Sequence, residues 1–511
     1  MQIVDNRALR LKLRNPTRVT TVIPKSKALS DTEVLVHWGV DETIALRELN
    51  IQAPAPITAR YSWPGQFKPM SHQRETAEFL SMNRRAFCFS EQGTGKTASA
   101  IWAADFLMEQ KKVRRVLVVC PLSIMDAAWR ADLFKFAMHR TVDVAHGAAD
   151  KRRKIINGGA EFIIINYDGI GIVEKEIAEG DFDLIIVDEA THYKNSQSKR
   201  WKTMARLVGD DTWLWMMTGT PAAQAPTDAY GLARLVSPAN VPRFFGAFRD
   251  QVMYKKSRFR WEAKPDAVET VHRALQPAIR FSKEDCLDLP DIVYMKRHVP
   301  MTKQQEVYYK KLKKDMVMEA AGAEVTTVNA AINMNKLLQI SAGAVYTDDG
   351  DTLEFDISER YKVLREAIDE SPNKVLVFVP FRSTIRMLAD KLKADGISTE
   401  VISGEVSAGA RTDIFRRFQD TPDPRVLVIQ PQSAAHGVTL TAADTIVWWA
   451  PTASLETYAQ ANARIHRSGQ VNKCTVVQLE SSPVERRLYG MLDKRIDVHS
   501  QILELYDGML D

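Results

Sequence analysis

The stretch that decides the fold is AFCFSEQGTGKTASAIWAADFLME, residues 86–109. It begins with the apolar run Ala86–Phe89, which predicts a short buried strand, and it ends with Ala98–Glu109, which predicts a helix. Between them lies the loop Ser90–Thr97, with glycines at two of its eight positions. A strand, a glycine-containing loop and a helix in this order form the context that a phosphate-binding loop requires.

The loop also holds the residue types that phosphate binding needs. Gly93 and Gly95 let backbone N–H groups turn inward around phosphate oxygens, and the helix N-terminus adds a partial positive charge. Lys96 is placed to reach the terminal phosphates, and the Thr97 hydroxyl to ligate Mg²⁺. Ser90 stands where the pattern G-x-x-x-x-G-K-[ST] has its first Gly. A chance Gly-Lys-Thr on a surface loop is the weaker alternative, because a strand and a helix flank this one.

Apolar strands and helices alternate on both sides of this stretch. The first run of expected strands continues with Val116–Cys120, Phe162–Ile165, Leu184–Val187 and Trp213–Met217. The second run comprises Val375–Val379, Thr399–Ile402, Val426–Ile429, Thr445–Trp448 and Thr475–Leu479. The helices expected among them include Met125–Phe136, Thr203–Val208, Thr384–Ala394, Leu455–Ile465 and a long one after Val484. Continuous apolar strands that alternate with helices predict parallel sheets covered on both faces.

The predicted fold class is α/β, with two parallel-sheet lobes, a helical insert and a small, mainly β N-terminal module. The insert contains two expected helices, Gln304–Met318 and Val328–Ile340, and the first is rich in lysine. The expected domains are the basic module at 1–55, the first lobe at 56–290, the helical connector at 291–345, and the second lobe with a terminal helix at 346–511.

Composition excludes several classes of protein. The chain has 511 residues, of which 45% are hydrophobic and 26% charged, so wholesale disorder and a fibrous fold are excluded. Lys and Arg number 69 against 64 Asp and Glu, an excess too small to identify a binder of polyanions. The four cysteines contain no C-x-x-C pair, which favours free thiols in a reducing compartment. No signal peptide or membrane-length apolar run is present in the sequence. We expect a soluble protein without a membrane contact, cytoplasmic in a prokaryote or infected host cell, or nuclear in a eukaryote.

The N-terminal module is expected to contain three short strands, Leu9–Leu13, Arg18–Ile23 and Val34–Trp38. In the first of them Arg10, Lys12 and Arg14 alternate with leucines, so a strand places all three charges on one face. That face is either an ordinary solvated surface, which is the commoner case, or a face that contacts nucleic acid.

A second group of chemically active residues lies in Asp183–Asn195, DLIIVDEATHYKN. Asp188 ends an expected buried strand, beside the strand of the phosphate-binding loop, where an outer ligand for Mg²⁺ is needed. Glu189 follows directly and is placed to orient and deprotonate an attacking water. Alone, an Asp-Glu pair at a strand end is as often a solvated sheet edge. Together with the phosphate-binding loop it indicates a site for hydrolysis of a nucleoside triphosphate.

Further segments complete a pattern. They are Gln73 in PMSHQR (69–74), Val116–Trp129 (VLVVCPLSIMDAAW), TGTP (218–221), Arg280–Asp291 (RFSKEDCLDLPD), Val426–Val447 and QANARIHRSGQ (460–470). With these motifs, in this order over residues 66 to 480, the sequence resembles the Swi/Snf-type ATPases of helicase superfamily two. It departs from them in having Thr191 before His192 where the family has D-E-A-H, and Gln432 where a basic residue is usual. Its insertions are short, as in a compact prokaryotic or viral-type member.

The resemblance implies two RecA-like lobes with ATP and Mg²⁺ in the cleft between them. The catalytic residues would be Lys96, Asp188, Glu189 and the arginine fingers Arg464 and Arg467, with Thr97 and Asp188 on the metal. A transition state with charge on three oxygens independently favours guanidinium donors. An Arg-x-x-Arg on a helix is by itself more often a solvated face. The nucleotide would be held by Gln73, which recognises adenine, and by Ser90, Gln92, Gly93, Thr94, Gly95, Lys96, Thr97 and Gln460.

The resemblance also implies contacts with DNA and a coupling segment. Coupling would fall to Thr218, Gly219 and Thr220. The candidate DNA contacts are Ser123, Asn166, Lys194 and Asn195 in the first lobe, and Arg382, Ser403 and Ser433 in the second. These groups follow expected strand ends and suit phosphates better than base edges, so we expect sequence-independent, salt-sensitive binding.

The function expected from this pattern is an ATP-dependent double-stranded DNA translocase, a monomeric motor that remodels DNA or displaces bound proteins. Its partner would be double-stranded or branched DNA; the sequence names no protein partner. A strand-separating helicase for forks or branched DNA is the alternative. An RNA-dependent ATPase is disfavoured by the form of Gln460–Gln470. A non-catalytic DNA-binding scaffold would be expected to have lost Lys96, Glu189 or Arg467, and all three are present.

Overall fold

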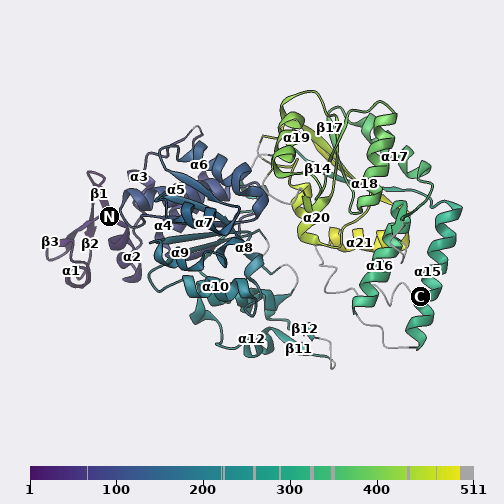
Figure 1. Ribbon diagram of the computed structural model, residues 1–511. Helices are drawn as coiled ribbons and strands as arrows, with labels where there is room; N and C mark the ends of the chain where they lie inside the picture. The colour runs from purple at the N-terminus through teal and green to yellow at the C-terminus, as the bar shows by residue number, and fades with distance from the viewer. Residues whose placement is uncertain are drawn as a thin grey trace. The chain divides into compact units, whose positions relative to one another are not determined.

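The computed structural model describes residues 1–494, except 66, 220, 223–224, 257–260, 287–288, 323–326, 347–351, 434–437 and 468. The chain divides into two compact units. Met1–Ala222 and Pro226–Cys286 form the first, and Leu287–Asp511 with Ala223–Ala225 forms the second. Each unit is built around one parallel sheet (Figure 1). The predicted α/β class with two parallel-sheet lobes is therefore confirmed.

The sheet of the first unit has seven strands in the order β13-β5-β10-β9-β6-β8-β7, all parallel. The strands are β5 (Arg85–Cys88), β6 (Val116–Cys120), β7 (Val142–Ala145), β8 (Phe162–Asn166), β9 (Leu184–Asp188), β10 (Trp213–Met217) and β13 (Ala278–Ile279). Successive residues of the central strands enter two different apolar clusters, one on each face. Burial on both faces explains why these strands are continuously apolar.

Helices flank this sheet. They are α4 (Ser71–Met82), α5 (Lys96–Glu109), α6 (Ala131–Phe136), α7 (Ala149–Ile156), α8 (Tyr167–Ile170), α9 (Glu174–Glu179), α10 (Lys199–Leu207), α11 (Ala229–Val236), α12 (Phe245–Val252), α13 (Ala267–Ala274) and α14 (Lys283–Cys286). The hairpin β11 (Met253–Lys255) and β12 (Trp261–Ala263) follows α12. The helix expected at Met125–Phe136 begins instead with a π-helical turn, Met125–Arg130, and becomes α-helical only in α6.

The second unit has a six-stranded parallel sheet in the order β14-β21-β20-β17-β19-β18. The strands are β14 (Ile292–His298), β17 (Lys374–Phe378), β18 (Thr399–Ile402), β19 (Val426–Ile429), β20 (Ala443–Trp448) and β21 (Cys474–Glu480). Its helices are α15 (Lys303–Gly322), α16 (Thr327–Ala342), α17 (Ser358–Glu370), α18 (Arg382–Ala394), α19 (Ala408–Asp420), α20 (Leu455–Asn462) and α21 (Pro483–Asp493). A small hairpin, β15 (Ala344–Tyr346) and β16 (Thr352–Glu354), follows α16, and two apolar clusters again cover the sheet.

The N-terminal module is a four-stranded antiparallel sheet in the order β1-β2-β4-β3. Its strands are β1 (Gln2–Val4), β2 (Ala8–Lys12), β3 (Ser26–Ser30) and β4 (Glu33–His37), accompanied by α1 (Thr17–Val22), α2 (Val40–Glu48) and the single turn α3 (Ile57–Arg60). The alternation predicted for the first strand is confirmed within β2, with Leu9 and Leu11 buried and Arg10 and Lys12 exposed, but Arg14 lies beyond the end of the strand. Arg10 forms an ion pair with Glu33 at 2.7 Å, so this face is not purely basic.

The strand predicted at Arg18–Ile23 is wrong, because the segment forms helix α1. Its β-branched residues favoured a strand in the sequence. However, Val19 and Ile23, four residues apart, are the ones that enter the module's core, which is helical spacing. Pro16 precedes the helix with φ −64°, a value preset for a helical start.

The module is joined to the sheet of the first unit by shared apolar contacts and hydrogen bonds. Val40 and Ala55 belong to the same apolar cluster as helix α5. Arg47 of α2 bonds to the Glu78 carboxylate of α4 at 3.3 Å and to the Ala53 carbonyl at 3.0 Å. Removal of residues 1–55 would therefore expose part of the core of the first unit.

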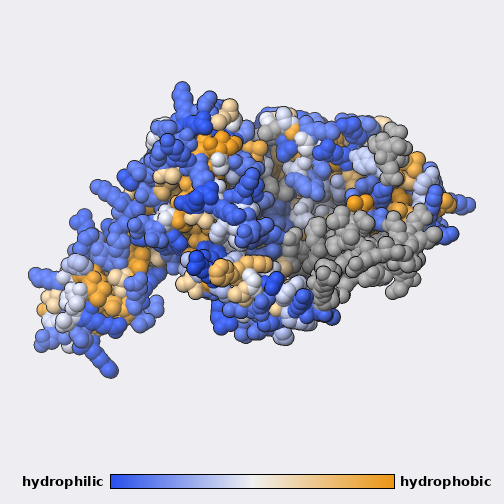
Figure 2. Space-filling model, turned by 60° about the horizontal axis from the view of Figure 1, so that its bottom comes forward, coloured by the Kyte–Doolittle hydropathy of each residue, from blue (hydrophilic) through white to orange (hydrophobic). Residues whose placement is uncertain are grey.

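Hydrophilic residues dominate the face shown in Figure 2, where hydrophobic residues form small separate groups. The exposed large hydrophobic side chains of the N-terminal module include Ile3, Val22 and Leu29. Within the described part of the chain, the helices are too short or too polar to span a bilayer.

A buried ion pair connects two helices of the second unit. Arg360 on α17 and Glu485 on α21 have side chains that are 3% and 0% exposed, and they bond at 2.7 Å. The same guanidinium donates to the hydroxyl of Ser481 at 2.9 Å and to the carbonyls of Ser341 and Leu479 at 2.9 and 3.0 Å. One side chain thus joins two helices, the end of α16 and the end of β21.

Replacing Arg360 with Leu leaves the Glu485 carboxylate buried without its counter-charge. We expect Arg360→Leu to lower the free energy of unfolding by about 3–5 kcal/mol. Arg386→Leu is the matched control, since Arg386 forms an exposed ion pair with Glu405, also at 2.7 Å, and exposed pairs contribute little. Urea denaturation followed by tryptophan fluorescence measures both. Equal effects of the two substitutions would contradict the assigned role.

Candidate functional site

The phosphate-binding loop connects β5 to α5 and depends on two left-handed glycines. Gly93 has φ +87°, and Gly95, the residue that caps α5, has φ +83°. A Cβ at Gly95 would also overlap the side-chain amide of Gln73. A residue with a Cβ is strained in such a conformation, so the local geometry requires glycine at both positions.

The Lys96 ammonium is held over this loop by its backbone carbonyls. It donates to the carbonyls of Ser90 at 2.8 Å and Glu91 at 3.2 Å. Thr94 is buried and its hydroxyl donates to the Glu91 carbonyl, whereas Gln92 and Thr97 are half-buried. The loop is thus internally braced, with the lysine at the N-terminus of α5.

The structure explains why Ser90 replaces the usual first glycine. The side chain is 2% exposed, and its hydroxyl accepts a hydrogen bond from the Phe281 N–H at 3.1 Å. The Glu91 N–H donates to the Phe281 carbonyl at 2.9 Å, and the Lys283 N–H donates to the Glu91 carboxylate at 3.2 Å. Part of the segment 280–291 singled out in the sequence therefore supports the loop from the side of β13.

Helix α4 contacts the loop through two adjacent residues. The Gln73 side-chain amide donates to the Thr94 carbonyl at 3.3 Å and accepts from the Met70 N–H at 3.0 Å. His72, which sequence reasoning missed, is 3% exposed and its Nε2 bonds to the same Thr94 carbonyl at 2.8 Å. No spacing rule marks such a histidine in a single sequence.

Asp188 lies at the carboxyl end of β9, at the same edge of the sheet as the loop. We expected its strand to lie beside β5, and that was wrong, because β10 lies between them. Met217 at the end of β10 pairs with Cys88 of β5 on one side and with Asp188 on the other. The intervening strand therefore brings its own loop, the TGTP segment, into the site.

Burial and hydrogen bonds fix the Asp188 carboxylate, which belongs to a residue only 9% exposed. Oδ2 accepts from the Trp129 indole N–H at 2.9 Å, and Oδ1 accepts from the Glu189 N–H at 3.0 Å. Burial raises the pKa of Asp188, and the Lys96 charge and the Trp129 hydrogen bond oppose that rise. A bound cation would favour the charged form further.

The donor set around Asp188 fits Mg²⁺. Carboxylate and hydroxyl oxygens are the ligands that Mg²⁺ prefers, and it is usually held by one or two protein groups together with substrate phosphates and water. Asp188 and Thr97 supply those two oxygen types. Among the described residues no group of three or more His, Cys, Asp or Glu side chains forms a metal cage.

Glu189 adopts a left-handed backbone conformation, with φ 48° and ψ 56°. Such a conformation is unfavourable for a residue with a side chain and is typical of functional sites. The Tyr167 hydroxyl donates to the Asp188 carbonyl at 2.6 Å and more weakly to the Glu189 carbonyl at 3.4 Å. Tyr167 thereby holds the backbone on both sides of the bend.

His192, which departs from the D-E-A-H pattern, interacts with neighbours beyond the loop. Its ring lies 4.5 Å from the Tyr167 ring, centroid to centroid, and its Nδ1 is 3.5 Å from the guanidinium of Arg200. The ring stays exposed on one side, but its partial desolvation and, secondarily, the charge of Arg200 lower the pKa of His192. The shift favours the uncharged form of the ring.

The TGTP segment touches the phosphate-binding loop. Thr218 is fully buried, and its N–H donates to the Cys88 carbonyl at 3.0 Å. A Cβ at Gly219 would lie 3.8 Å from the Ser90 carbonyl oxygen and from the Gln92 side chain. Thr220, the third residue predicted to couple the lobes, lies outside the described residues.

The candidate DNA contacts of the first unit follow the carboxyl ends of three strands. Ser123 follows β6, Asn166 ends β8, and Lys194 and Asn195 follow β9. Ser123 and Asn195 are exposed, whereas Lys194 forms an ion pair with Asp228 at 3.2 Å. The Asn166 side chain accepts from the buried Arg152 at 3.0 Å.

In the second unit the candidate contacts follow three neighbouring strands. Arg382 begins α18 after β17, Ser403 follows β18, and Ser433 follows β19. Arg382 is exposed and lies close to Gly404, next to Ser403. Gln432, the departure from the family pattern, is exposed. These three polar groups thus gather at the carboxyl edge of the second sheet.

The two candidate arginine fingers lie beyond helix α20. The helix was expected to run to Ile465 and so to include Arg464, and that was wrong. The helix ends at Asn462 and is followed by turns. Arg464 is 5% exposed and donates to the carbonyls of Gln460 at 3.0 Å and Val438 at 3.1 Å. Arg467 is half-buried and donates to the Val438 carbonyl at 3.3 Å. Gln460 is buried, and its amide donates to Glu456 at 3.1 Å.

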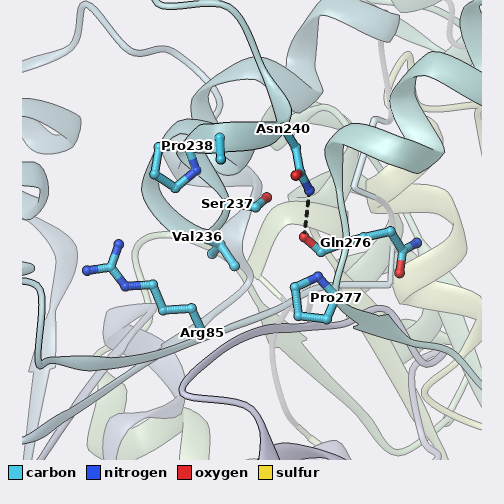
Figure 3. Close-up of a pocket in the computed structure, with 8 residues that line it drawn as sticks. Arg85, Val236, Ser237, Pro238, Asn240, Gln276 and Pro277 are labelled. Carbon is cyan, nitrogen blue, oxygen red and sulfur yellow. Dashed lines mark hydrogen bonds between the residues drawn. The ribbon is translucent and has the colours of Figure 1, made fainter. Parts of the chain in front are cut away.

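A shallow pocket of about 590 Å³ lies elsewhere in the first unit (Figure 3). It is lined by Arg85, Val236, Ser237, Pro238, Ala239, Asn240, Gln276 and Pro277. Arg85 begins β5, so the pocket lies at the end of that strand remote from the phosphate-binding loop. Its polar side chains bond to the backbone, as Asn240 does to the Gln276 carbonyl at 3.0 Å and Ser237 to the Ala274 carbonyl at 2.9 Å. It therefore offers no catalytic group.

Comparison with known families decides what this arrangement belongs to. Residues 72–343 match the SNF2-related domain, and residues 359–469 match the helicase conserved C-terminal domain. The chain belongs to the SNF2-related family. The resemblance to Swi/Snf-type ATPases is thereby confirmed, and the matched ranges include the phosphate-binding loop, the Asp188–Glu189 pair and both arginines.

Among individual relatives, an uncharacterized ATP-dependent helicase of Mycoplasma genitalium is 25% identical over 81% of this chain and 40% of its own. The chromodomain-helicase-DNA-binding protein 1-like of Danio rerio is 24% identical over 83% of this chain and 43% of its own. This SNF2-related chain thus spans about two fifths of the length of these relatives. The SWI2/SNF2 ATPase core of Sulfolobus solfataricus, solved with dsDNA, is 20% identical over 88% of this chain and 95% of its own, with a TM-score of 0.42.

Proposed function

We propose that this SNF2-related chain is an ATP-driven motor that moves along double-stranded DNA and remodels it or displaces bound proteins. The observation that carries the proposal is the meeting, at one sheet edge, of a braced phosphate-binding loop and a buried Asp188 followed by a strained Glu189. Family membership supports ATP as the substrate, and the name of the zebrafish relative includes DNA binding.

In the proposed reaction the residues of the first unit have different roles. Lys96 binds the terminal phosphates, and Thr97 and Asp188 hold Mg²⁺, which would neutralise charge on the phosphates. Glu189 accepts the proton of the attacking water, and its left-handed backbone bends the chain away from the line of β9. Gln73, already bonded to Thr94 of the loop, would recognise adenine.

We propose different roles for the two arginines of the second unit. Arg464 is buried and bonded to backbone carbonyls of α20 and of the segment before β20, so it would position its turn. Arg467 is the more accessible and would act as the arginine finger on the γ-phosphate. Because this finger belongs to a different unit from Lys96, the two must be brought together for hydrolysis, and DNA bound by both units would favour that arrangement.

The DNA surface that we propose consists of the polar groups at the carboxyl edges of the two sheets. Exposed Ser123 and Arg382 are the strongest candidates, since the side chains of Asn166, Lys194 and Asn195 already have protein partners. Short hydroxyl, amide and guanidinium groups reach phosphates without reading bases. We therefore propose binding that is independent of sequence and weakened by salt.

Lys96→Ala and Glu189→Gln should both abolish ATP turnover, by different routes. Lys96 binds phosphates, so its loss weakens nucleotide affinity as well. Glu189 acts on water, so its amide still binds ATP. Nucleotide-binding titrations and steady-state hydrolysis rates separate the two effects, with exposed Lys111→Ala as a control. Near-normal turnover in Glu189→Gln would rule out Glu189 as the base.

Arg467→Ala should retain binding of ATP and DNA but lose most of the DNA-stimulated hydrolysis. Loss of an arginine finger costs about 10³–10⁵ in rate in related phosphoryl-transfer enzymes. The residual rate should approach the DNA-free rate of the unmodified chain. Arg416→Ala, which removes an exposed guanidinium paired with Asp413, is the matched control. Strong stimulation surviving in Arg467→Ala would contradict the proposed finger.

Translocation on duplex DNA is tested by displacement of a third strand. The unmodified chain should displace a triplex-forming oligonucleotide from a duplex in an ATP-dependent reaction, and should leave the strands of a forked duplex paired. Glu189→Gln provides the inactive control. Efficient separation of forks without triplex displacement would favour the strand-separating helicase instead.

A further inference from the structure

Two side chains from other segments hold the Asp188–Glu189 pair in place. The Trp129 indole N–H donates to one oxygen of the Asp188 carboxylate at 2.9 Å. The Tyr167 hydroxyl donates to the Asp188 carbonyl at 2.6 Å and to the Glu189 carbonyl at 3.4 Å. Trp129 is fully buried, and Tyr167 is 7% exposed. One residue therefore orients the carboxylate, and the other supports the backbone that carries it.

Trp129 and Tyr167 approach from opposite faces of the seven-stranded sheet. Trp129 belongs to the apolar cluster that contains Ile186, whereas Tyr167 belongs to the cluster that contains Val187. Ile186 and Val187 are consecutive residues of β9, so their side chains point to opposite faces. The pair that follows them is consequently held from both sides, and a shift of either segment would be transmitted to it.

Each of these side chains lies on a segment that begins at a proposed DNA contact. Ser123 lies six residues before Trp129, and Asn166 directly precedes Tyr167. The strands that lead into the two segments are neighbours, since Cys120 of β6 pairs with Asn166 of β8. A duplex that rests on this edge of the sheet would therefore touch both segments at once.

Two backbone conformations in this region are unusual and need support from neighbouring residues. Trp129 lies in the π-helical turn Met125–Arg130, a rare conformation that is frequent at functional sites. Glu189 has a left-handed backbone that is unfavourable without external support. Small changes in the supporting hydrogen bonds would thus alter where the Glu189 carboxylate points.

We propose that Trp129 and Tyr167 are positioning residues that couple DNA binding at this sheet edge to the geometry of Asp188 and Glu189. The inference rests on the proposed function and deepens it, since it names the route by which DNA controls the site. DNA that shifts Asp188 and Glu189 would change the affinity for nucleotide. Because coupling between two binding sites is reciprocal, nucleotide must then change the affinity for DNA by the same factor.

The test measures this coupling first through binding, in the chain of residues 1–511. The dissociation constant of a non-hydrolysable ATP analogue with Mg²⁺ is determined with and without a saturating short duplex. In the unmodified chain the two values should differ by about fivefold or more. Trp129→Phe removes the indole N–H, and Tyr167→Phe removes one oxygen atom. In each variant the ratio should fall to within about twofold of one, and the DNA-stimulated part of ATP hydrolysis should fall with it.

Matched controls separate coupling from folding. Trp102→Phe removes an indole N–H that donates to the Pro64 carbonyl at 2.9 Å, and Tyr230→Phe removes a hydroxyl that donates to the Arg243 carbonyl at 2.7 Å. Both controls should keep the full ratio. If Trp129→Phe fails to fold, the smaller change Tyr167→Phe still decides the question. If Trp129→Phe and Tyr167→Phe respond to DNA as the unmodified chain does, only this inference is overturned. If DNA changes neither the nucleotide affinity nor the hydrolysis rate of the unmodified chain, the proposed function is overturned as well.

Discussion

Parallel pairing of β5, β10 and β9 is the constraint on which the candidate site depends. In this pairing Met217 lies between Cys88 and Asp188, so the loops that leave the three strands emerge side by side. Parallel strands end at a common edge, and ligands of open α/β sheets bind outside those carboxyl ends. The phosphate-binding loop, Thr218 and the Asp188–Glu189 pair are therefore assembled by the sheet itself, without a metal cage or a disulfide among the described residues.

The site concentrates features that are unfavourable by themselves. Asp188 is a buried carboxyl group, and Glu189 has a left-handed backbone that costs about 1–3 kcal/mol. The apolar clusters on the two faces of the sheet supply the stability that offsets these costs. The hydrogen bonds from Trp129 and Tyr167 then select one arrangement of the pair. An arrangement maintained by a few such bonds can be altered by a partner that contacts the same segments.

Sequence patterns predicted the central strands because each must be apolar on both faces. Val116–Cys120, Trp213–Met217 and Val426–Ile429 have the predicted bounds, as does Thr399–Ile402. The edge strand Ile292–His298 was not predicted, because only one neighbour pairs with it and most of its residues are partly or fully exposed. Helix α1 was predicted as a strand, since β-branched residues outweighed the four-residue spacing of Val19 and Ile23.

The motif residues of the site could be predicted because their chemistry restricts both residue type and spacing. Their supporting residues could not. The Trp129 indole and the His72 ring bond to residues that are far from them in the chain, and no pattern in a single sequence indicates such contacts. Likewise, the end of α20 at Asn462, before both arginines, depends on contacts of the turn with Val438. Physical roles that arise from tertiary contact become visible only in the folded chain.

The most direct measurement of the central claim is the steady-state rate of ATP hydrolysis by the chain of residues 1–511 as the concentration of duplex DNA is increased. If the carboxyl edge of the first sheet is a hydrolytic site under DNA control, the rate should rise to a plateau with duplex concentration, and this rise should weaken with added salt. The whole rise should vanish in Glu189→Gln. A rate that is independent of DNA, or a rise that survives in Glu189→Gln, would contradict the account.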